Sequence, residues 1–182
     1  MATVPNPRTW TSSEQVTAAK LNTDIRDSWN YFKARPFCLL GKTADTAITI
    51  STLTAIPWDV ELKDSDGGHS NVTNNSRYTA QTAGWYSVRC TTLLFRADFS
   101  WVDLTIRKNG TTQQSRSTLV PTLGSSDWAM LGTAGYVQLA VSDYVEATII
   151  MLGGSSNNGN VVAHELFTSW YSSRLQVEWV SA

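Results

Sequence analysis

The chain has 182 residues, which gives room for one compact domain and a short appendage rather than for two full domains. Its formal net charge is only -1 and no stretch approaches the roughly 20 apolar residues of a bilayer span, so we expect a soluble protein that neither binds nucleic acid nor inserts into a membrane. Charged residues make up only 16% while Thr, Ser, Val and Trp are plentiful, and this composition favours strands and turns over long helices.

The first part of the chain predicts one helix, over about 13–33. Ser12 is the expected N-cap, because Gln15 follows it at the spacing of a capping box, and Pro36 sets the latest point at which the helix can end. An apolar stripe recurs every three or four residues at Ala18, Leu21, Ile25, Trp29 and Phe32. The stripe predicts packing on the chain's own head or on helices of sister subunits, since two heptads do not specify a coiled coil alone.

From Phe37 onward the hydrophobic period changes to two, which predicts an antiparallel β-sandwich. The strongest local signal is Asn109-Gly110, because this pair accepts the positive φ values of a type I′ hairpin between a strand over 101–108 and a polar strand from Thr111. The other expected strands cover 37–42, 46–50, 56–62, 77–80, 85–97, 128–140, 144–152 and, with a break, 166–180. This number of strands predicts a two-sheet jelly roll.

Two expected strands are apolar on both faces at one end, in Leu93-Leu94-Phe95 and in Ile149-Ile150-Met151-Leu152. A half-exposed sandwich strand should keep one face polar, so something must cover the second face. A homotrimer would cover it by packing three sandwiches around an axis. The predicted trimer interface contains Leu93, Phe95, Ile150 and Leu152, and cover by the chain's own loops or helix is the alternative.

Several later segments stand in the order and spacing of a known pattern. These segments are Ala83-Gly84-Trp85-Tyr86-Ser87-Val88, Phe95, Lys108-Asn109-Gly110 and Asp143-Tyr144-Val145-Glu146. They resemble the tumour-necrosis-factor-like jelly roll shared with the globular heads of the complement family, in which Gly-x-Tyr opens a central strand and a Gly-Asp-x-Val-like segment opens a later one. The chain departs from the pattern at Ser142, where the family has glycine, and residues 173–179 match its last strand only loosely.

Two further segments resemble proteins of bacteriophages. Residues 10–27 resemble the N-terminal segment of small tail proteins in phages of actinobacteria, and residues 58–80 resemble the front half of phage-encoded heads of this type. The resemblances imply that residues 1–36 dock the subunit on other virion proteins and that residues 37–182 project as a trimeric head. The implied docking residues are Trp10, Leu21, Ile25, Trp29 and Phe32, and the implied location is the virion, assembled in the bacterial host cytoplasm.

The sequence contains no pattern for catalysis or for a cofactor, so we expect a non-enzymatic protein. Its two histidines, His69 and His164, lie in no zinc-ligand spacing, and residues 153–156 lack the frame of a serine nucleophile. The loop from Asp64 to Asp66 is similar to the start of a calcium loop but lacks the distal glutamate, so a plain turn is the interpretation and a bound cation the alternative. Cys38 and Cys90 lie in apolar runs and are expected as buried free thiols.

Eight tryptophans exceed what a small core needs, and tryptophan is favoured at protein interfaces and on sugar faces. Trp85 and Trp101 share expected strand faces with polar residues, and together with Trp128 they are candidates for partner contacts. Core or trimer packing is the alternative for each of them. Asn157 and Asn158, in a flexible loop, are further candidates for contact with a host cell-surface glycan or protein.

Three functions are compatible with these features. The first is a minor tail or tail-tip protein whose loops, including 153–160 and 124–127, touch the host envelope. The second is a trimeric capsid decoration protein that stabilises the head of the phage. A secreted ligand of the complement or cytokine type is disfavoured, because the chain shows no signal peptide and no collagen repeat.

Overall fold

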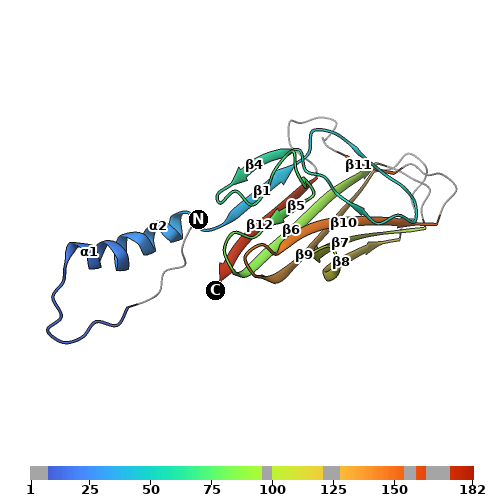
Figure 1. The fold of residues 1–182 in the computed structure, drawn as a ribbon. Helices are drawn as coiled ribbons and strands as arrows, with labels where there is room; N and C mark the ends of the chain where they lie inside the picture. Colours follow the sequence, from blue (N-terminus) through green and yellow to red (C-terminus); the bar gives the residue numbers. More distant parts are fainter. Residues whose placement is uncertain (1–7, 96–99, 121–127, 154–158, 163–172) are drawn as a thin grey trace.

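The computed structural model describes residues 8–95, 100–120, 128–153, 159–162 and 173–182, and it shows a helix followed by a two-sheet β-sandwich (Figure 1). The helix consists of α1 (Ala18–Leu21), the π-helical segment η1 (Asn22–Arg26) and α2 (Asp27–Lys33). The strands are β1 (Phe37–Gly41), β2 (Thr46–Ile48), β3 (Thr54–Ala55), β4 (Val60–Asp64), β5 (Arg77–Thr79), β6 (Gly84–Phe95), β7 (Trp101–Lys108), β8 (Thr112–Leu119), β9 (Trp128–Leu139), β10 (Tyr144–Leu152), β11 (Gly159–Val162) and β12 (Arg174–Ser181). The predicted mainly β architecture with a preceding helix is confirmed.

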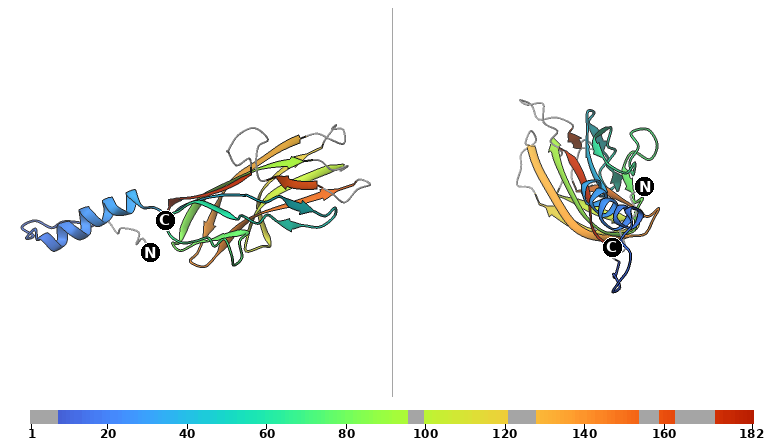
Figure 2. Two further views of the ribbon diagram at one scale, coloured as in Figure 1. Left: turned by 90° about the horizontal axis from the view of Figure 1, so that it is seen from above. Right: turned by 90° about the vertical axis from the view of Figure 1, so that its left-hand side faces the viewer.

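The strands form two antiparallel sheets. A seven-stranded sheet runs β2-β11-β6-β12-β1-β4 with β9 also beside β6, and a five-stranded sheet runs β3-β10-β7-β8 with β5 also beside β10. Strand β6 pairs with β9 along its whole length, from Gly84 opposite Leu139 to Phe95 opposite Trp128. Where β8 and β9 come together, the hydroxyl groups of Ser115 and Thr133 share a hydrogen bond. The two sheets therefore meet along one side of the sandwich (Figure 2).

The core lies between the two sheets, where alternate strand residues point inward. Its fully buried side chains include Leu40, Tyr78, Tyr86, Val88, Leu104, Ile106, Val137 and Ile149. Cys38 and Cys90 are free thiols inside this core, as the sequence predicts. Burial raises the pKa of both thiols, so that they stay protonated and behave as small apolar side chains.

The hairpin between β7 and β8 has the predicted turn. Asn109 has a φ of 51° and Gly110 a φ of 71°, the left-handed values that a type I′ turn requires. The Asn109 side chain donates from Nδ2 to Asp143 Oδ1 over 2.8 Å, and its Oδ1 accepts from the Tyr144 amide over 2.9 Å. The turn is therefore tied to the start of β10.

The helix begins at Ala18, so the predicted start near Ser13 with Ser12 as N-cap is wrong. Ser13 has a φ of 67°, a left-handed conformation that turns the chain away from a helical path. Thr17 is the N-cap instead, and its hydroxyl oxygen accepts from the Lys20 amide over 3.3 Å. The residues before it form a separate turn, in which the Glu14 amide donates to the Thr11 carbonyl over 3.1 Å.

The expected single strand over 56–62 is also wrong, because β3 ends at Ala55 and β4 begins at Val60. The Ile56 amide donates to the Ala147 carbonyl over 2.9 Å and the Trp58 amide to the Asn75 carbonyl over 2.8 Å. Pro57 between them has no amide hydrogen to donate. The backbone here bonds to separate segments, so it cannot continue as one ladder.

The helix projects from one end of the sandwich, roughly along the direction of the strands (Figures 1 and 2). Tyr31 fastens it to the head: the ring is only 5% exposed and packs edge-on against Trp179 of β12, with 5.2 Å between ring centroids. The Trp179 amide also donates to the Pro36 carbonyl over 2.9 Å. Within the described ranges, no helix is long and apolar enough to cross a bilayer.

Candidate interaction surfaces

The outer face of the seven-stranded sheet carries large exposed apolar side chains. Tyr136 is 66% exposed and Met130 59% exposed on β9, and Trp85 is 41% exposed on the neighbouring β6. We call the outward residues of these two strands the β6–β9 face. It consists of Trp85, Ser87, Arg89, Thr91, Leu93, Met130, Gly132, Ala134, Tyr136 and Gln138. The small residues between Met130 and Tyr136 leave room for side chains of another molecule to approach the sheet.

The outer face of the five-stranded sheet is different, because its polar side chains satisfy one another. Asp103 on β7 accepts a hydrogen bond from the Thr118 hydroxyl over 2.5 Å and lies 2.7 Å from Nη2 of Arg116. The hydroxyl groups of Thr105 and Thr148 lie 2.6 Å apart. This face has an internal network and needs no partner, so the β6–β9 face is the better candidate for burial against another molecule.

The structure places three of the four residues predicted for the trimer interface, and it separates them. Leu93 lies half-buried on the β6–β9 face, whereas Ile150 and Leu152 lie half-buried on the outer face of the five-stranded sheet. The side chain of Phe95 lies outside the described part of the chain. One flat contact cannot cover both outer faces of a sandwich, so these residues do not form a single surface.

Met130 and Tyr136, the most exposed large side chains of the β6–β9 face, are not among the residues predicted from the sequence. The available signal was the alternation along β9, where Leu131, Thr133, Val137 and Leu139 are buried while Met130, Gly132, Ala134, Tyr136 and Gln138 point outward. This alternation places both residues on the outer face of the sheet.

The tryptophans predicted as partner contacts lie on different sheets. Trp85 is on the β6–β9 face, while Trp101 is half-buried on the opposite sheet, with the guanidinium carbon of Arg116 5.7 Å from its ring centroid. The side chain of Trp128 and all of Asn157 and Asn158 lie outside the described residues. Trp85 and Trp101 therefore cannot belong to one ligand site on one copy of the chain.

The helix carries the second exposed apolar surface, which we call the helix stripe: Leu21, Ile25, Trp29 and Phe32. These four side chains are between 41% and 69% exposed. Ile25, Trp29 and Phe32 line a shallow groove of about 440 Å³ together with Asp24 and Ser28. The described part of the head does not cover the stripe, since Tyr31 makes the helix contact with the head.

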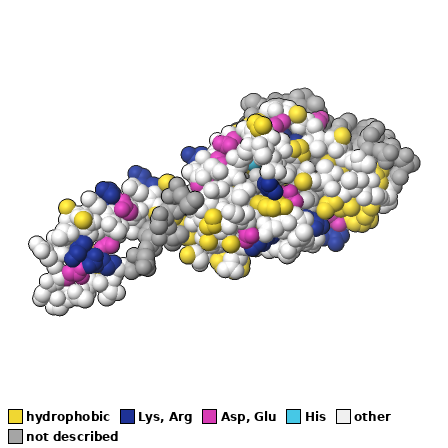
Figure 3. All heavy atoms as spheres, viewed as in Figure 1, with side chains coloured by type: hydrophobic (Ala, Val, Ile, Leu, Met, Phe, Trp, Pro, Cys, Tyr) yellow, Lys and Arg dark blue, Asp and Glu magenta, His cyan; other side chains and the backbone are white. Residues whose placement is uncertain are grey.

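Charged side chains gather at the far end of the helix (Figure 3). Glu14 forms ion pairs with Arg8 and, over 2.8 Å, with Lys20. Trp10 lies beside them, 41% exposed, with the guanidinium carbon of Arg8 4.8 Å from its ring centroid. The predicted docking residue Trp10 is thus part of the turn that precedes the helix, apart from the other four docking residues.

The loop after β4 is a turn stabilised by the Asp64 carboxylate. Its Oδ1 accepts from the amides of Asp66 and Gly67 over 3.2 and 3.0 Å, and its Oδ2 accepts from the His69 amide over 2.9 Å. Asp66 accepts from the Tyr78 hydroxyl over 2.8 Å, and desolvation raises the pKa of Asp66 to about 6. In the described ranges, no group of three or more His, Cys, Asp or Glu side chains could hold a metal ion.

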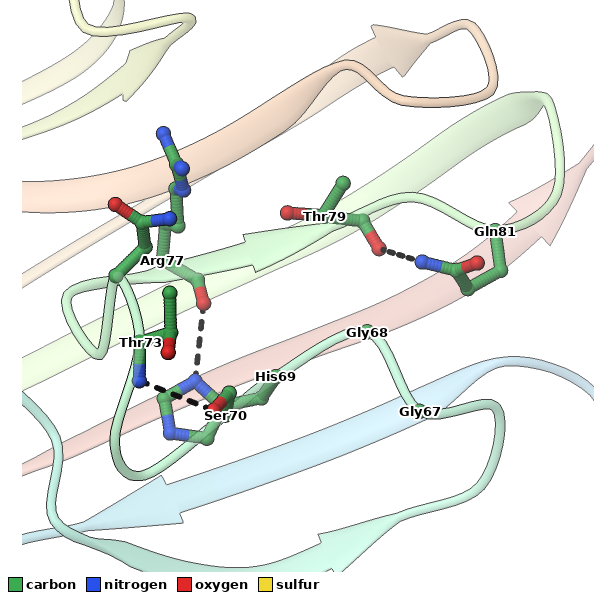
Figure 4. Close-up of a pocket in the computed structure, with 9 residues that line it drawn as sticks. Gly67, Gly68, His69, Ser70, Thr73, Arg77, Thr79 and Gln81 are labelled. Carbon is green, nitrogen blue, oxygen red and sulfur yellow. Dashed lines mark hydrogen bonds between the residues drawn. The ribbon is translucent and has the colours of Figure 1, made fainter.

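A polar pocket of about 280 Å³ lies between this loop and β5 (Figure 4). His69 Nδ1 lies 2.9 Å from the Arg77 carbonyl and donates to it, since a carbonyl only accepts. Asn74, Gln81 and several hydroxyl and glycine residues complete the lining. These groups can hydrogen-bond a small polar ligand, but they do not pair a nucleophile with a base.

Solved structures show which fold this is. A crystal structure of murine APRIL has a TM-score of 0.57 and 14% sequence identity, with the match covering 80% of this chain and 98% of that chain. The globular domain of zebrafish complement 1qA protein has a TM-score of 0.54 and 9% identity over the same shares of the two chains. No protein-family model matches the sequence, and no curated protein matches it either.

Identities of this size show a common fold and nothing more specific. The predicted tumour-necrosis-factor-like jelly roll is confirmed on that basis. The segments that carried the sequence resemblance begin the expected strands, with Gly84 opening β6 and Tyr144 opening β10. At the departure from the pattern, Ser142 has a φ of 74°, the left-handed conformation for which the family's glycine is suited.

Proposed function

We propose that this chain is a non-enzymatic structural subunit of a bacteriophage particle, with jelly-roll heads that form a homotrimer and an N-terminal segment that attaches the trimer to the virion. The observation that carries the trimer is the β6–β9 face, where Tyr136 and Met130 are mostly exposed in a single copy. The phage assignment rests on the resemblance of residues 10–27 to small phage tail proteins and of residues 58–80 to phage-encoded heads of this type.

The composition of the β6–β9 face suits a protein interface. Aromatic residues and methionine are enriched in interface cores while charged residues are depleted there, and Arg89 is the one charged residue among the ten that define the face. Fully burying a large apolar side chain contributes about 1.5–3 kcal/mol. In a trimer around an axis, each of the three copies would bury its own Tyr136, Met130 and Trp85.

The division of the chain follows from where the helix leaves the head. Residues 1–36 would be the attachment segment and residues 37–182 the projecting head, because the helix and the start of β6 lie at one pole. The strand ends that flank residues 124–127 and the part of the predicted loop 153–160 that precedes β11 lie at the other pole, where Trp128 pairs with Phe95 and Leu152 with Trp101. In a minor tail or tail-tip protein these loops would face a host glycan or protein.

The trimer can be tested with one substitution on the β6–β9 face. Tyr136→Glu would place three carboxylates in the dry contact, so we expect the full chain to sediment as a trimer and the Tyr136→Glu variant as a folded monomer. Val141→Glu is the matched control, because Val141 is 52% exposed but follows β9 in the turn to β10. A wild-type chain that sediments as a folded monomer at micromolar concentration would overturn the trimer, and a trimeric Tyr136→Glu variant would overturn its placement on this face.

The location on the particle decides between two versions of the virion role. We expect labelled antibody against the head to decorate the tail end of purified phage particles and to reduce infection. Label on the capsid, with infection unchanged, would instead support a decoration protein that stabilises the shell. If purified particles lack the chain altogether, the virion assignment is wrong.

A further inference from the structure

We propose that the three helices of one trimer pack on one another through the helix stripe and form a parallel three-helix stalk beneath the heads. Sister copies, rather than another virion protein, would then cover Leu21, Ile25, Trp29 and Phe32. This inference rests on the proposed trimer and names the partner of the helix surface within it.

The helix needs a partner to be stable. From Ala18 to Lys33 it makes about four turns, and isolated helices of this length are marginal in water. Most of the stability of such a helix comes from packing of its apolar side, yet the four stripe residues are exposed in the single copy. The stripe is therefore the surface that an assembly must cover.

The chain's own head is already in contact with a different side of the helix. Successive helical residues are about 100° apart, so Tyr31 points roughly 100° away from Phe32 and roughly 160° away from Trp29. Because Tyr31 is packed against Trp179, the head contacts a side of the helix that the stripe does not occupy.

The π-helical segment η1 improves the alignment of the stripe. Leu21, Ile25 and Trp29 are spaced by four residues, and in a continuous α-helix each such step would rotate the side chain by about 40°. A π turn takes more residues to complete than an α turn, so the segment from Asn22 to Arg26 reduces this rotation. The apolar side chains then follow one side of the helix, as a seam between helices requires.

The charges beside the stripe suit contact between identical helices. In a parallel trimer the same residue from each copy lies at the same height, so uncompensated charges near the seam would repel one another. Asp24 lies 3.8 Å from Nη1 of Arg8, and Ser28 beside it is neutral and donates its hydroxyl to the Asp24 carbonyl over 2.9 Å. The acidic group that lines the groove therefore has a counter-charge within its own chain, although its Oδ2 accepts no hydrogen bond from the described residues.

The helix is also joined to the sheet that carries the β6–β9 face. It leads through Pro36 into β1 of the seven-stranded sheet, where Phe37 and Leu39 are half-buried on the same side as the β6–β9 face. A trimer built on that face would bring the three helices close to the axis. Tethering of this kind gives effective concentrations in the millimolar range, so two heptads that are too few alone can suffice.

A consequence concerns attachment to the virion. If the stripe is buried in the stalk, the outer side of the stalk and the turn that contains Trp10 would make the contacts to other virion proteins. Of the five residues that the resemblance implied for docking, Trp10 alone would keep that role.

The test is a cysteine placed in the seam of the full-length chain. Ile25→Cys should give a disulfide between two helices of each trimer under mild copper-phenanthroline oxidation in dilute solution, seen as covalent dimer on a non-reducing denaturing gel. Asn30→Cys is the matched control, since Asn30 is exposed on the far side of the helix and should give at least about tenfold less dimer. The native Cys38 and Cys90 are at most 1% exposed and do not compete.

The outcomes separate this inference from the proposed trimer. A chain that sediments as a trimer but gives no more dimer with Ile25→Cys than with Asn30→Cys overturns the stalk and leaves the trimer standing. A monomeric chain overturns both.

A second measurement needs no change in the seam. Amide hydrogens of α2 should exchange at least about tenfold more slowly in the wild-type trimer than in the monomeric Tyr136→Glu variant, and equal exchange would also overturn the stalk.

Discussion

Asp143 is the residue whose ionisation contributes most visibly to the structure. Its Oδ1 accepts from Asn109 Nδ2, and its Oδ2 accepts from the Ala140 amide over 2.8 Å and lies 2.7 Å from Nζ of Lys108. The hydrogen bond from Asn109, followed by that from Lys108, lowers the pKa of Asp143 to about 2. One carboxylate thereby holds the β7–β8 turn against the start of β10.

The lowered pKa predicts a loss of stability in acid. The ionised carboxylate is favoured in the folded chain, so its contribution is present above the ordinary aspartate pKa of about 4 and is lost as the pH falls towards 2. We expect Asp143→Asn to lower the free energy of unfolding at pH 7 and to differ little from the wild type at pH 2, as measured by denaturant titration at one protein concentration. Asp27→Asn, at an exposed ion pair of the helix, should change little at either pH. An Asp143→Asn deficit that is equal at both pH values would contradict the prediction.

Single residues also show where sequence reasoning succeeds. The Asn109-Gly110 turn was predictable because the requirement for positive φ is local to the two residues. Lys42 was not predictable as a buried residue: it is 1% exposed, and its Nζ donates to Thr46 Oγ1 over 2.7 Å and to the Pro57 carbonyl over 2.6 Å. Those two acceptors, in β2 and in the link between β3 and β4, come close to Lys42 only in the folded chain, so the sequence does not show that they are neighbours.

Among the larger elements, most strands and the existence of the helix could be predicted, but their neighbours could not. Alternation gives the two faces of β6 and β9, yet only the pairing shows that Leu93 lies opposite Met130 and that Ile150 lies on the other sheet. The exposure of Trp85 could be predicted from the alternation along β6 alone. The placement of Leu93 and Ile150 on different sheets could not. A strand's own residues show which side chains share a face, whereas residues distant in the sequence determine the sheet to which the strand belongs.

The junction between helix and head depends on the contact of Tyr31 with Trp179. Aromatic pairs of this geometry contribute about 0.5–1.5 kcal/mol beyond the burial of the rings, and Tyr31→Ala would remove both contributions. We expect α2 amides in Tyr31→Ala to exchange at least about tenfold faster, while the amides of β6 and β12 keep their wild-type rates.

Tyr31→Phe is the control for this junction. The Tyr31 hydroxyl is buried and has no hydrogen-bond partner among the described residues, so its removal should not weaken the contact. Unchanged helix exchange in Tyr31→Ala would show that the ring does not hold the helix.

For the whole molecule, the two outer faces of the sandwich have different requirements. On the five-stranded sheet, Asp103, Arg116 and the threonine hydroxyls satisfy one another through hydrogen bonds and an ion pair, so this outer face can remain in contact with water. The β6–β9 face cannot do the same for Tyr136 and Met130, whose apolar surface is not covered by any described part of the chain. This asymmetry, rather than the likeness of fold, is why the proposed trimer is placed on one particular side of the head.

The helix projects along the strand direction, so the subunit is elongated and its two ends lie far apart. The four-turn helix spans about 24 Å and the long central strand β6 about 40 Å, so the distal end of β6 stands roughly 60 Å from the turn that contains Trp10. If the subunit attaches to a virion as proposed, a receptor recessed beneath neighbouring virion proteins by less than this distance would still be within its reach.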